Sequence, residues 1–305
     1  MLSVILGVSG AVIYGVSDFF GGLGSRHLGA LRLTWLSVIA GLLSVLLTYQ
    51  LISGDWANIP WQALFWGGLS GLCGSFAIMF LYASLAIGPM SIVSPLGALV
   101  AAIVPVVWDI IVGRLLTPLG YVAIVLALIA VVMIAFVKTD KRVRVNPRGI
   151  VFAILAGIGI GGYLICMNQT PSDSGFQPFI ANRVVAVAVL SIAVLATWVV
   201  SRLRARQSRP AGSPRADVVV GERGEVNWRL GLLFAAVCGV LDTAGNVAIL
   251  TGMRFGSLSV MGVLASLYPA GTIALAAIVL KERIGIIQFI GMLLALAAIA
   301  LLSLT

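Results

Sequence analysis

The stretch from Ser257 to Leu304, SLSVMGVLASLYPAGTIALAAIVLKERIGIIQFIGMLLALAAIALLSL, contains two apolar runs that are separated only by the charged tripeptide Lys281-Glu282-Arg283. The first run covers residues 257–280 and the second covers residues 284–304. Each run has the roughly 20 apolar residues that a helix needs to cross a hydrocarbon core about 30 Å thick. The stretch therefore predicts a hairpin of two membrane-spanning helices.

The same pattern occurs 168 residues earlier in the chain, where apolar runs at 89–112 and 115–137 flank Gly113-Arg114. At this constant offset, and without a gap, identical residues pair along the two hairpins: Gly88 with Gly256, Ser91 with Ser259, Leu96 with Leu264, Leu99 with Leu267, Ile110 with Ile278, Leu126 with Leu294 and Leu128 with Leu296. Apolar sequences match easily by chance, so the evidence is the constant offset and the glycine and serine spacing. The offset predicts a tandem duplication.

The composition is typical of a membrane protein. Of the 305 residues, 61% are hydrophobic and 10% are charged, which leaves too little polar surface to cover a soluble particle of this size. The net charge of +9 would suit nucleic-acid binding in a soluble protein, but the cations concentrate in two connecting segments, 138–148 and 202–229. We therefore expect these segments to face lipid headgroups, and we expect no nucleic-acid partner.

Ten apolar spans follow one another along the chain, at residues 2–22, 31–52, 61–84, 90–112, 117–137, 149–168, 178–200, 229–251, 257–280 and 285–304. They predict a first repeat of five helices at 1–137, a basic connection at 138–148, and a second repeat of five helices at 149–305 that contains a flexible basic loop at 201–228. The predicted fold class is an all-α integral membrane protein with ten transmembrane helices.

The duplication is predicted to be inverted, because five helices per repeat place equivalent points of the two repeats on opposite sides of the membrane. Arg32 at the start of the second helix then corresponds to Arg183 at the start of the seventh. Tyr14 in the first helix corresponds to Tyr163 in the sixth. Two inverted repeats are a usual basis for alternating access, in which one half rocks against the other.

The distribution of basic residues predicts the orientation of the bundle. The even-numbered connections contain only Arg114, Arg183 and Arg254. The odd-numbered connections contain sixteen basic residues: Arg26, Arg32, Lys138, Lys141, Arg142, Arg144, Arg148, Arg202, Arg204, Arg206, Arg209, Arg215, Arg223, Arg229, Lys281 and Arg283. The positive-inside rule places the odd-numbered connections in the cytoplasm and both termini outside.

The second hairpin resembles the closing signature of the EamA repeat in the drug/metabolite transporter (DMT) superfamily. In that signature a helix containing Tyr-Pro is followed by Glu-Arg, and then by a glutamine and a glycine that open the last helix. The matching residues here are Tyr268, Pro269, Glu282, Arg283, Gln288 and Gly291. The first half is similar through the helix start at Arg32 and through residues 84–105, which include Pro95. Arg114 stands where the repeat offset would place the glutamate, so Glu282 has no counterpart in the first half.

The resemblance implies ten helices around a central cavity, secondary transport, and often the export of metabolites or amphiphiles. We therefore predict a multi-pass carrier of the cytoplasmic membrane that moves a small organic metabolite, such as an amino acid or a small amphiphile, by alternating access. Its partners would be the substrate, the lipid bilayer and, if transport is proton-coupled, protons. Both a monomer and a homodimer remain open. No enzymatic activity, catalytic residue, cofactor or metal is expected.

Two aspartates are the best candidates for substrate or proton binding, because an ionisable side chain within a membrane span costs roughly 2.5 to 3.5 kcal/mol and is usually functional. Asp242 lies near the middle of the eighth span, with Asn246 one turn later on the same face. Asp18 lies in the first span and shares its face with Tyr14. Such a carboxyl could exchange protons or bind a cationic substrate group. The alternative is a carboxyl that only joins helices through hydrogen bonds.

Aromatic side chains could stack against an organic substrate, although tyrosine and tryptophan also belong to interface belts. These candidates are Tyr14, Tyr82, Tyr163, Tyr268 and Trp108.

Several other residues have expected structural roles. Broken helices can form a substrate site at the membrane midplane, and we expect breaks in the fourth and ninth spans. The prolines concerned are Pro89, Pro95, Pro105 and Pro269. Glu282 and Arg283 are expected to form a structural ion pair at the membrane edge, and Asp109 is expected to pair with Arg114.

Other classes of membrane protein remain alternatives to a carrier. An ATP-driven pump would need a glycine-rich phosphate-binding loop, and the sequence contains none. A passive pore or uniporter and a non-transporting scaffold stay open. An intramembrane aspartyl protease is weighed because Asp18 and Asp242 each follow a glycine by three residues, but the Gly-x-Gly-Asp pattern is absent at both sites.

Overall fold

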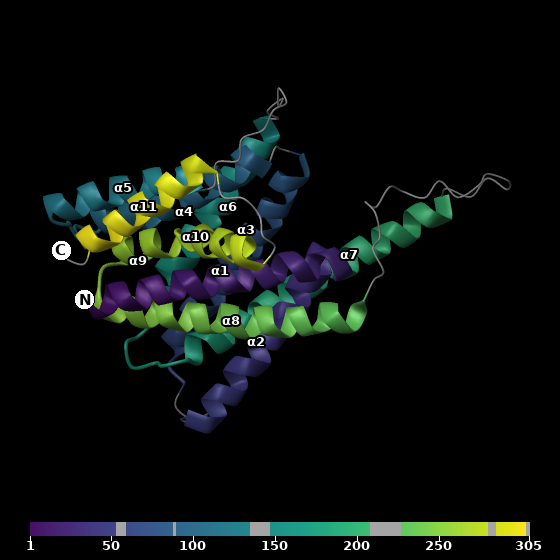
Figure 1. Cartoon of the computed structure of the whole chain (residues 1–305). Coiled ribbons are helices and arrows are strands. Elements are labelled where there is room, and N and C mark those ends of the chain that lie inside the picture. Colours follow the sequence, from purple (N-terminus) through teal and green to yellow (C-terminus); the bar gives the residue numbers. More distant parts are fainter. Residues whose placement is uncertain (53–58, 88–89, 135–146, 208–226, 280–284, 303–305) are drawn as a thin grey trace.

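The structure is a computed structural model that describes residues 1–52, 59–87, 90–134, 147–207, 227–279 and 285–302. Every regular element within these ranges is a helix, and the helices form an elongated bundle in which the start of α1 and the end of α11 lie at the same end (Figure 1). The eleven helices are α1 (Leu2–Leu28), α2 (Ala30–Ile52), α3 (Trp61–Ile87), α4 (Met90–Ile111), α5 (Pro118–Ile134), α6 (Pro147–Asn168), α7 (Gln177–Gln207), α8 (Trp228–Phe255), α9 (Leu258–Ala265), α10 (Tyr268–Val279) and α11 (Ile286–Leu302).

The helices have the lengths and apolar compositions of membrane spans. Within the described residues, α1, α2, α3, α6, α7 and α8 each contain a stretch long and apolar enough to cross a membrane. Shorter apolar stretches, at Leu96–Ile111, Pro118–Ile134, Leu258–Thr272 and Ile286–Leu302, occupy the remaining predicted spans. The chain is a multi-pass membrane protein.

The two halves of the chain interleave instead of forming separate bodies. The most extensive helix contacts all join a helix that precedes residue 135 to one that follows residue 146. Thus α1 packs along α8, α3 along α6 and α7, and α5 along α11, while contacts between neighbouring helices of one half are much smaller. The core lies where the halves meet, so a cavity there is lined from both.

The ninth predicted span is divided into two helices, as expected from its proline. Helix α9 ends at Ala265 and α10 begins at Tyr268, with Ser266 and Leu267 between them. Pro269 lies in the first turn of α10. N–H groups in a first turn have no acceptor within the helix, so a proline there costs no hydrogen bond.

The fourth span is not divided, so the expected break there is wrong for the described residues. Helix α4 continues through Pro95 and Pro105 from Met90 to Ile111. Membrane helices tolerate internal proline because neighbouring groups can bind the carbonyl that the proline leaves without a donor.

Helix α7 continues beyond the membrane span, into the segment predicted as a flexible loop. It ends at Gln207 and projects from the bundle (Figure 1). Residues 201–207, SRLRARQ, are mostly strong helix formers, which explains the extension. The Arg202 guanidinium carbon lies 4.6 Å from the ring centre of Trp198, one turn earlier. The prediction of a loop therefore fails at its start, and residues 208–226 lie outside the described part of the chain.

Two glycines allow the close helix contacts that position the cavity. A Cβ atom on Gly239 of α8 would lie 2.0 Å from the carbonyl oxygen of Ser37 in α2. A Cβ atom on Gly15 of α1 would lie 2.7 Å from the carbonyl oxygen of Tyr268 in α10. Since each contact is to rigid backbone, only glycine permits these helices to approach so closely.

Helix α9 is buried along its whole length. All eight of its residues are buried within the bundle, between helices of both halves. The carboxylate of Asp109 at the end of α4 accepts hydrogen bonds from the backbone N–H and the hydroxyl of Ser259, at 2.8 and 2.7 Å. The predicted pairing of Asp109 with Arg114 is therefore wrong, because Asp109 caps the first turn of α9 while Arg114 is exposed.

Candidate functional site

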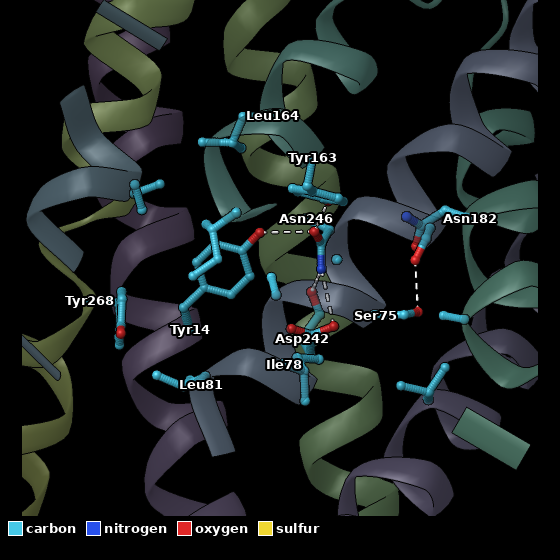
Figure 2. Close-up of a pocket in the computed structure, with 18 of the residues that line it drawn as sticks. Tyr14, Ser75, Ile78, Leu81, Tyr163, Leu164, Asn182, Asp242, Asn246 and Tyr268 are labelled. Carbon is cyan, nitrogen blue, oxygen red and sulfur yellow. Dashed lines mark hydrogen bonds between the residues drawn. The ribbon is translucent and has the colours of Figure 1, made fainter. Parts of the chain in front are cut away.

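A cavity of about 310 Å³ lies in the centre of the bundle, at the lower end of the size range of small-molecule sites. Helices from both halves of the chain form its wall, and most of the wall is apolar. Figure 2 shows Tyr14 of α1, Tyr163 of α6 and Asp242 and Asn246 of α8 around it. Among the described lining residues, the charged ones are Asp18, Arg183 and Asp242.

The side-chain amide of Asn246 is the centre of a hydrogen-bond network. Its oxygen accepts from the hydroxyls of both Tyr14, at 2.9 Å, and Tyr163. Its nitrogen donates to the backbone oxygen and to Oδ2 of Asp242, at 2.6 and 3.0 Å. The one-turn spacing of Asp242 and Asn246 thus places both on one face, as predicted. The two tyrosines that the repeat matched to each other meet at the same atom.

Arg183 of α7 forms an ion pair with Oδ2 of Asp242 of α8. The same nitrogen lies 3.4 Å from the hydroxyl oxygen of Thr243, which donates at 2.9 Å to the backbone oxygen of Gly239. The Arg183 side chain is 9% exposed and that of Asp242 is 37% exposed. Both residues line the cavity, and the Asp242 side chain is the more exposed of the two.

Arg183 was predicted only as the residue that opens the seventh span. It is instead the seventh residue of α7, nearly two turns into the helix, so its side chain reaches the cavity wall. Its Nε is buried and has no hydrogen-bond partner among the described residues. Arg32, its counterpart in the repeat, is exposed and does not line the cavity. The sequence signal for this site was an arginine, Arg183, within an otherwise apolar span.

Asp18 lines the cavity from α1, one turn after Tyr14. Its side chain is exposed, and no donor among the described residues hydrogen-bonds its carboxylate. The neighbouring Ser17 donates elsewhere, to the backbone oxygen of Cys238 at 3.0 Å. The two aspartates therefore differ, because Asp242 is held by Arg183 and Asn246 while Asp18 is open to a ligand.

The remaining predicted site residues divide between the cavity and other places. Tyr268 lines the cavity at the start of α10. Trp108 packs against the hydrophobic core and does not line the cavity. The side chains of Tyr82 and Pro95, and the whole of Glu282 and Arg283, lie outside the described residues.

Small polar residues of the cavity wall were not predicted. Ser75 of α3, Asn182 of α7 and Ser266 at the end of α9 all line it. Asn182 donates to the hydroxyl of Ser70 at 2.8 Å. Serine and asparagine within apolar spans are too common in helix packing to identify a site from the sequence alone.

Comparisons with known proteins add a family and a fold. The family model described as the EamA-like transporter family matches residues 147–304, slightly more than half of the chain. No curated protein matches the chain. A crystal structure, described only as that of a protein, is similar with a TM-score of 0.67 and 16% sequence identity, over 99% of this chain and 96% of that one. At this identity the likeness shows a shared fold over nearly the whole chain.

Proposed function

We propose, because this chain belongs to the EamA-like transporter family, that it is a secondary carrier that moves a small organic metabolite across the cytoplasmic membrane by alternating access. The family is one of transporters of the DMT type. The observation that supports a carrier best is the central cavity, which helices of both halves line. It contains an ion pair and a carboxylate, that of Asp18, with which no described residue pairs. An amino acid or a small amphiphile, exported from the cell, would match its size and its apolar wall.

The proposal includes an inverted repeat of five spans. We count α9 and α10 as one span and pair each of the first five spans with the span five positions later. Under this pairing α1 corresponds to α6 and α3 to α8, so the packing of α1 on α8 corresponds to that of α6 on α3. The same pairing relates α2 on α8 to α7 on α3, and α4 on α6 to α9 and α10 on α1. The pairs α5 with α11 and α2 with α7 are related to themselves. This pattern is what a two-fold axis in the membrane plane would produce.

Alternating access requires that the cavity be closed at one end in each state. Helix α9 lies at one end, where Gly262, Ala265 and Ser266 contribute to the cavity wall and the rest of the helix is buried in protein. If the basic connections face the cytoplasm, the start of α9 faces outside. The structure would then represent a state that is closed to the outside, and α9 would move when the cavity opens there.

Proton coupling through the cavity aspartates is a further part of the proposal. Asp18 has no hydrogen-bond donor among the described residues and could therefore take up a proton or bind a substrate, whereas the carboxylate of Asp242 already accepts from Arg183 and Asn246. Substrate and proton would then compete for the carboxylate of Asp18, which is a simple basis for the exchange of substrate against protons.

The test is a measurement of lumenal pH in proteoliposomes that contain the purified chain. A trapped dye reports the pH while amino acids, sugars and organic cations are added one at a time. A saturable, substrate-dependent pH change that Asp18→Asn or Asp242→Asn abolishes is expected. Saturable tracer exchange without a pH change would contradict proton coupling, and flux that rises linearly with substrate would favour a passive pore.

A further inference from the structure

Of the charged groups that line the cavity, the two carboxylates are more exposed than the guanidinium. Asp18 is exposed, and the Asp242 side chain is 37% exposed against 9% for Arg183. With all three groups ionised, one guanidinium faces two carboxylates, so the described part of the wall has one uncompensated negative charge. The low dielectric of the surrounding apolar wall strengthens the attraction of that charge for a cation.

Asp18 is the carboxylate that lacks compensation. No donor among the described residues binds it, and its neighbour Ser17 is engaged with Cys238. A carboxylate within a membrane span is costly unless a proton or a cation neutralises it. Asp242 does not share this need, because Arg183 and Asn246 already donate to it.

The rest of the wall determines which kind of cation would fit. Ile78, Leu81, Ile160, Leu164 and Leu190 surround the cavity with aliphatic surface. A metal ion such as Ca²⁺ binds through about six to eight oxygen ligands, several of them carboxylates. The described residues contain no group of three or more His, Cys, Asp or Glu side chains that could hold a metal ion. An apolar molecule with a single charged end would bury its body here without losing hydrogen bonds.

Tyrosine rings contribute a second feature that favours a cation. The hydroxyls of Tyr14 and Tyr163 both donate to Asn246, which fixes the two side chains at the cavity wall. Tyr268 lines the same cavity. An ammonium group over the face of such a ring gains a cation–π interaction.

We infer that the ligand of this cavity is a small organic cation, an apolar molecule with one protonated amino group that binds the carboxylate of Asp18. The inference uses the proposed function only in taking this cavity as the transport site. It identifies Asp18, and not the paired Asp242, as the residue that selects the substrate by charge.

The experiment is equilibrium binding to the purified full chain in detergent, by calorimetry, without any gradient. Three probes of similar size differ only in the polar end: 2-phenylethylamine, 2-phenylethanol and 3-phenylpropionate. The amine is expected to bind at least about tenfold more tightly than either other probe, because a hydrogen bond to a charged group is strong in a dry site. Equal binding of the alcohol or the carboxylate, or no binding of the amine, would overturn the inference.

Variants of Asp18 show whether the charge acts at this residue. Asp18→Asn should weaken amine binding about tenfold and leave binding of the alcohol unchanged, while Asp18→Glu should keep the amine affinity within about threefold. Asp173→Asn makes the same chemical change at an exposed position outside the cavity and should have no effect. Gel filtration and the unfolding temperature verify that each variant is folded. Unchanged amine binding in folded Asp18→Asn would also overturn the inference.

The two proposals fail separately. If the amine binds through Asp18 but no compound gives saturable flux in proteoliposomes, the charge selection stands and the carrier function fails. If neutral or anionic compounds are transported saturably and the amine is not preferred, the carrier stands and the charge selection fails.

Discussion

Arg183 of α7 donates a hydrogen bond to Oδ2 of Asp242 of α8, and this ion pair is the one found among the described residues. It lies at the mostly apolar cavity wall, where each charge is stabilised by the other. The pair therefore joins two helices of the second half and at the same time sets the charge of the cavity.

Removing the cation of this pair should destabilise the protein strongly. Arg183→Leu leaves the carboxylate of Asp242 in an apolar wall without its cation, which we expect to cost about 3 kcal/mol of unfolding free energy. The double variant Arg183→Leu/Asp242→Asn removes both charges and should recover most of that loss. Unfolding temperatures in detergent measure both effects. A double variant that is no more stable than Arg183→Leu would show that the pairing of charges is not the cause.

Replacing the glycine at the contact between α2 and α8 should separate these helices. The Cβ atom of Gly239→Ala would overlap the backbone oxygen of Ser37, and neither backbone can move without displacing its helix. We expect an overpacking cost of about 1–3 kcal/mol, seen as a lower unfolding temperature, and weaker transport. Gly22→Ala is the matched control, because a Cβ atom there meets nothing within 4 Å. A similar loss in both variants would contradict the steric explanation.

The two tyrosines that share the oxygen of Asn246 should act together. Tyr14→Phe and Tyr163→Phe each remove one donor, and after either change the other hydroxyl still binds the oxygen. The effect of the double variant on substrate affinity should therefore differ from the sum of the single effects by about 0.5–3 kcal/mol. A double-mutant cycle on substrate affinity measures this coupling. Strictly additive effects would mean that the shared acceptor does not link the two residues.

Asp109 should stabilise the start of α9. Asp109→Ala removes the acceptor for the N–H and the hydroxyl of Ser259, and we expect a cost of about 1–2 kcal/mol, as for other lost helix caps. Asp109→Asn keeps one acceptor oxygen and should lose less. Unfolding temperatures compare the two, and accessibility of a cysteine introduced at Ser257 reports whether the start of α9 loosens. Equal stability of Asp109→Ala and the unchanged protein would contradict the capping role.

The predictions from the sequence succeeded where the chemistry is local. The apolar spans follow from hydropathy, and the shared face of Asp242 and Asn246 follows from helical spacing. The break between α9 and α10 follows from Tyr268-Pro269, since a proline in a first turn is compatible with a new helix.

The predictions failed where the outcome depends on contacts between distant segments. The carboxylate of Asp109 binds Ser259, which lies 150 residues away, and not the guanidinium of the nearby Arg114. Arg183 lies at the cavity wall, where it forms an ion pair with Asp242 of α8, and no pattern within α7 predicts that partner. The continuous α4 shows the same limit, because neighbouring helices decide whether a proline interrupts a membrane helix.

The interleaving of the two halves has a consequence for how the protein is made. Helices α1 to α5 leave the ribosome before their main packing partners, α6, α7, α8 and α11, have been synthesised. Insertion of the first half into the bilayer must therefore precede its folding, and the early helices must wait in lipid as separate, loosely associated spans. Most of the native packing forms only when the second half arrives, so premature termination before α6 would leave a set of inserted helices without their main packing partners.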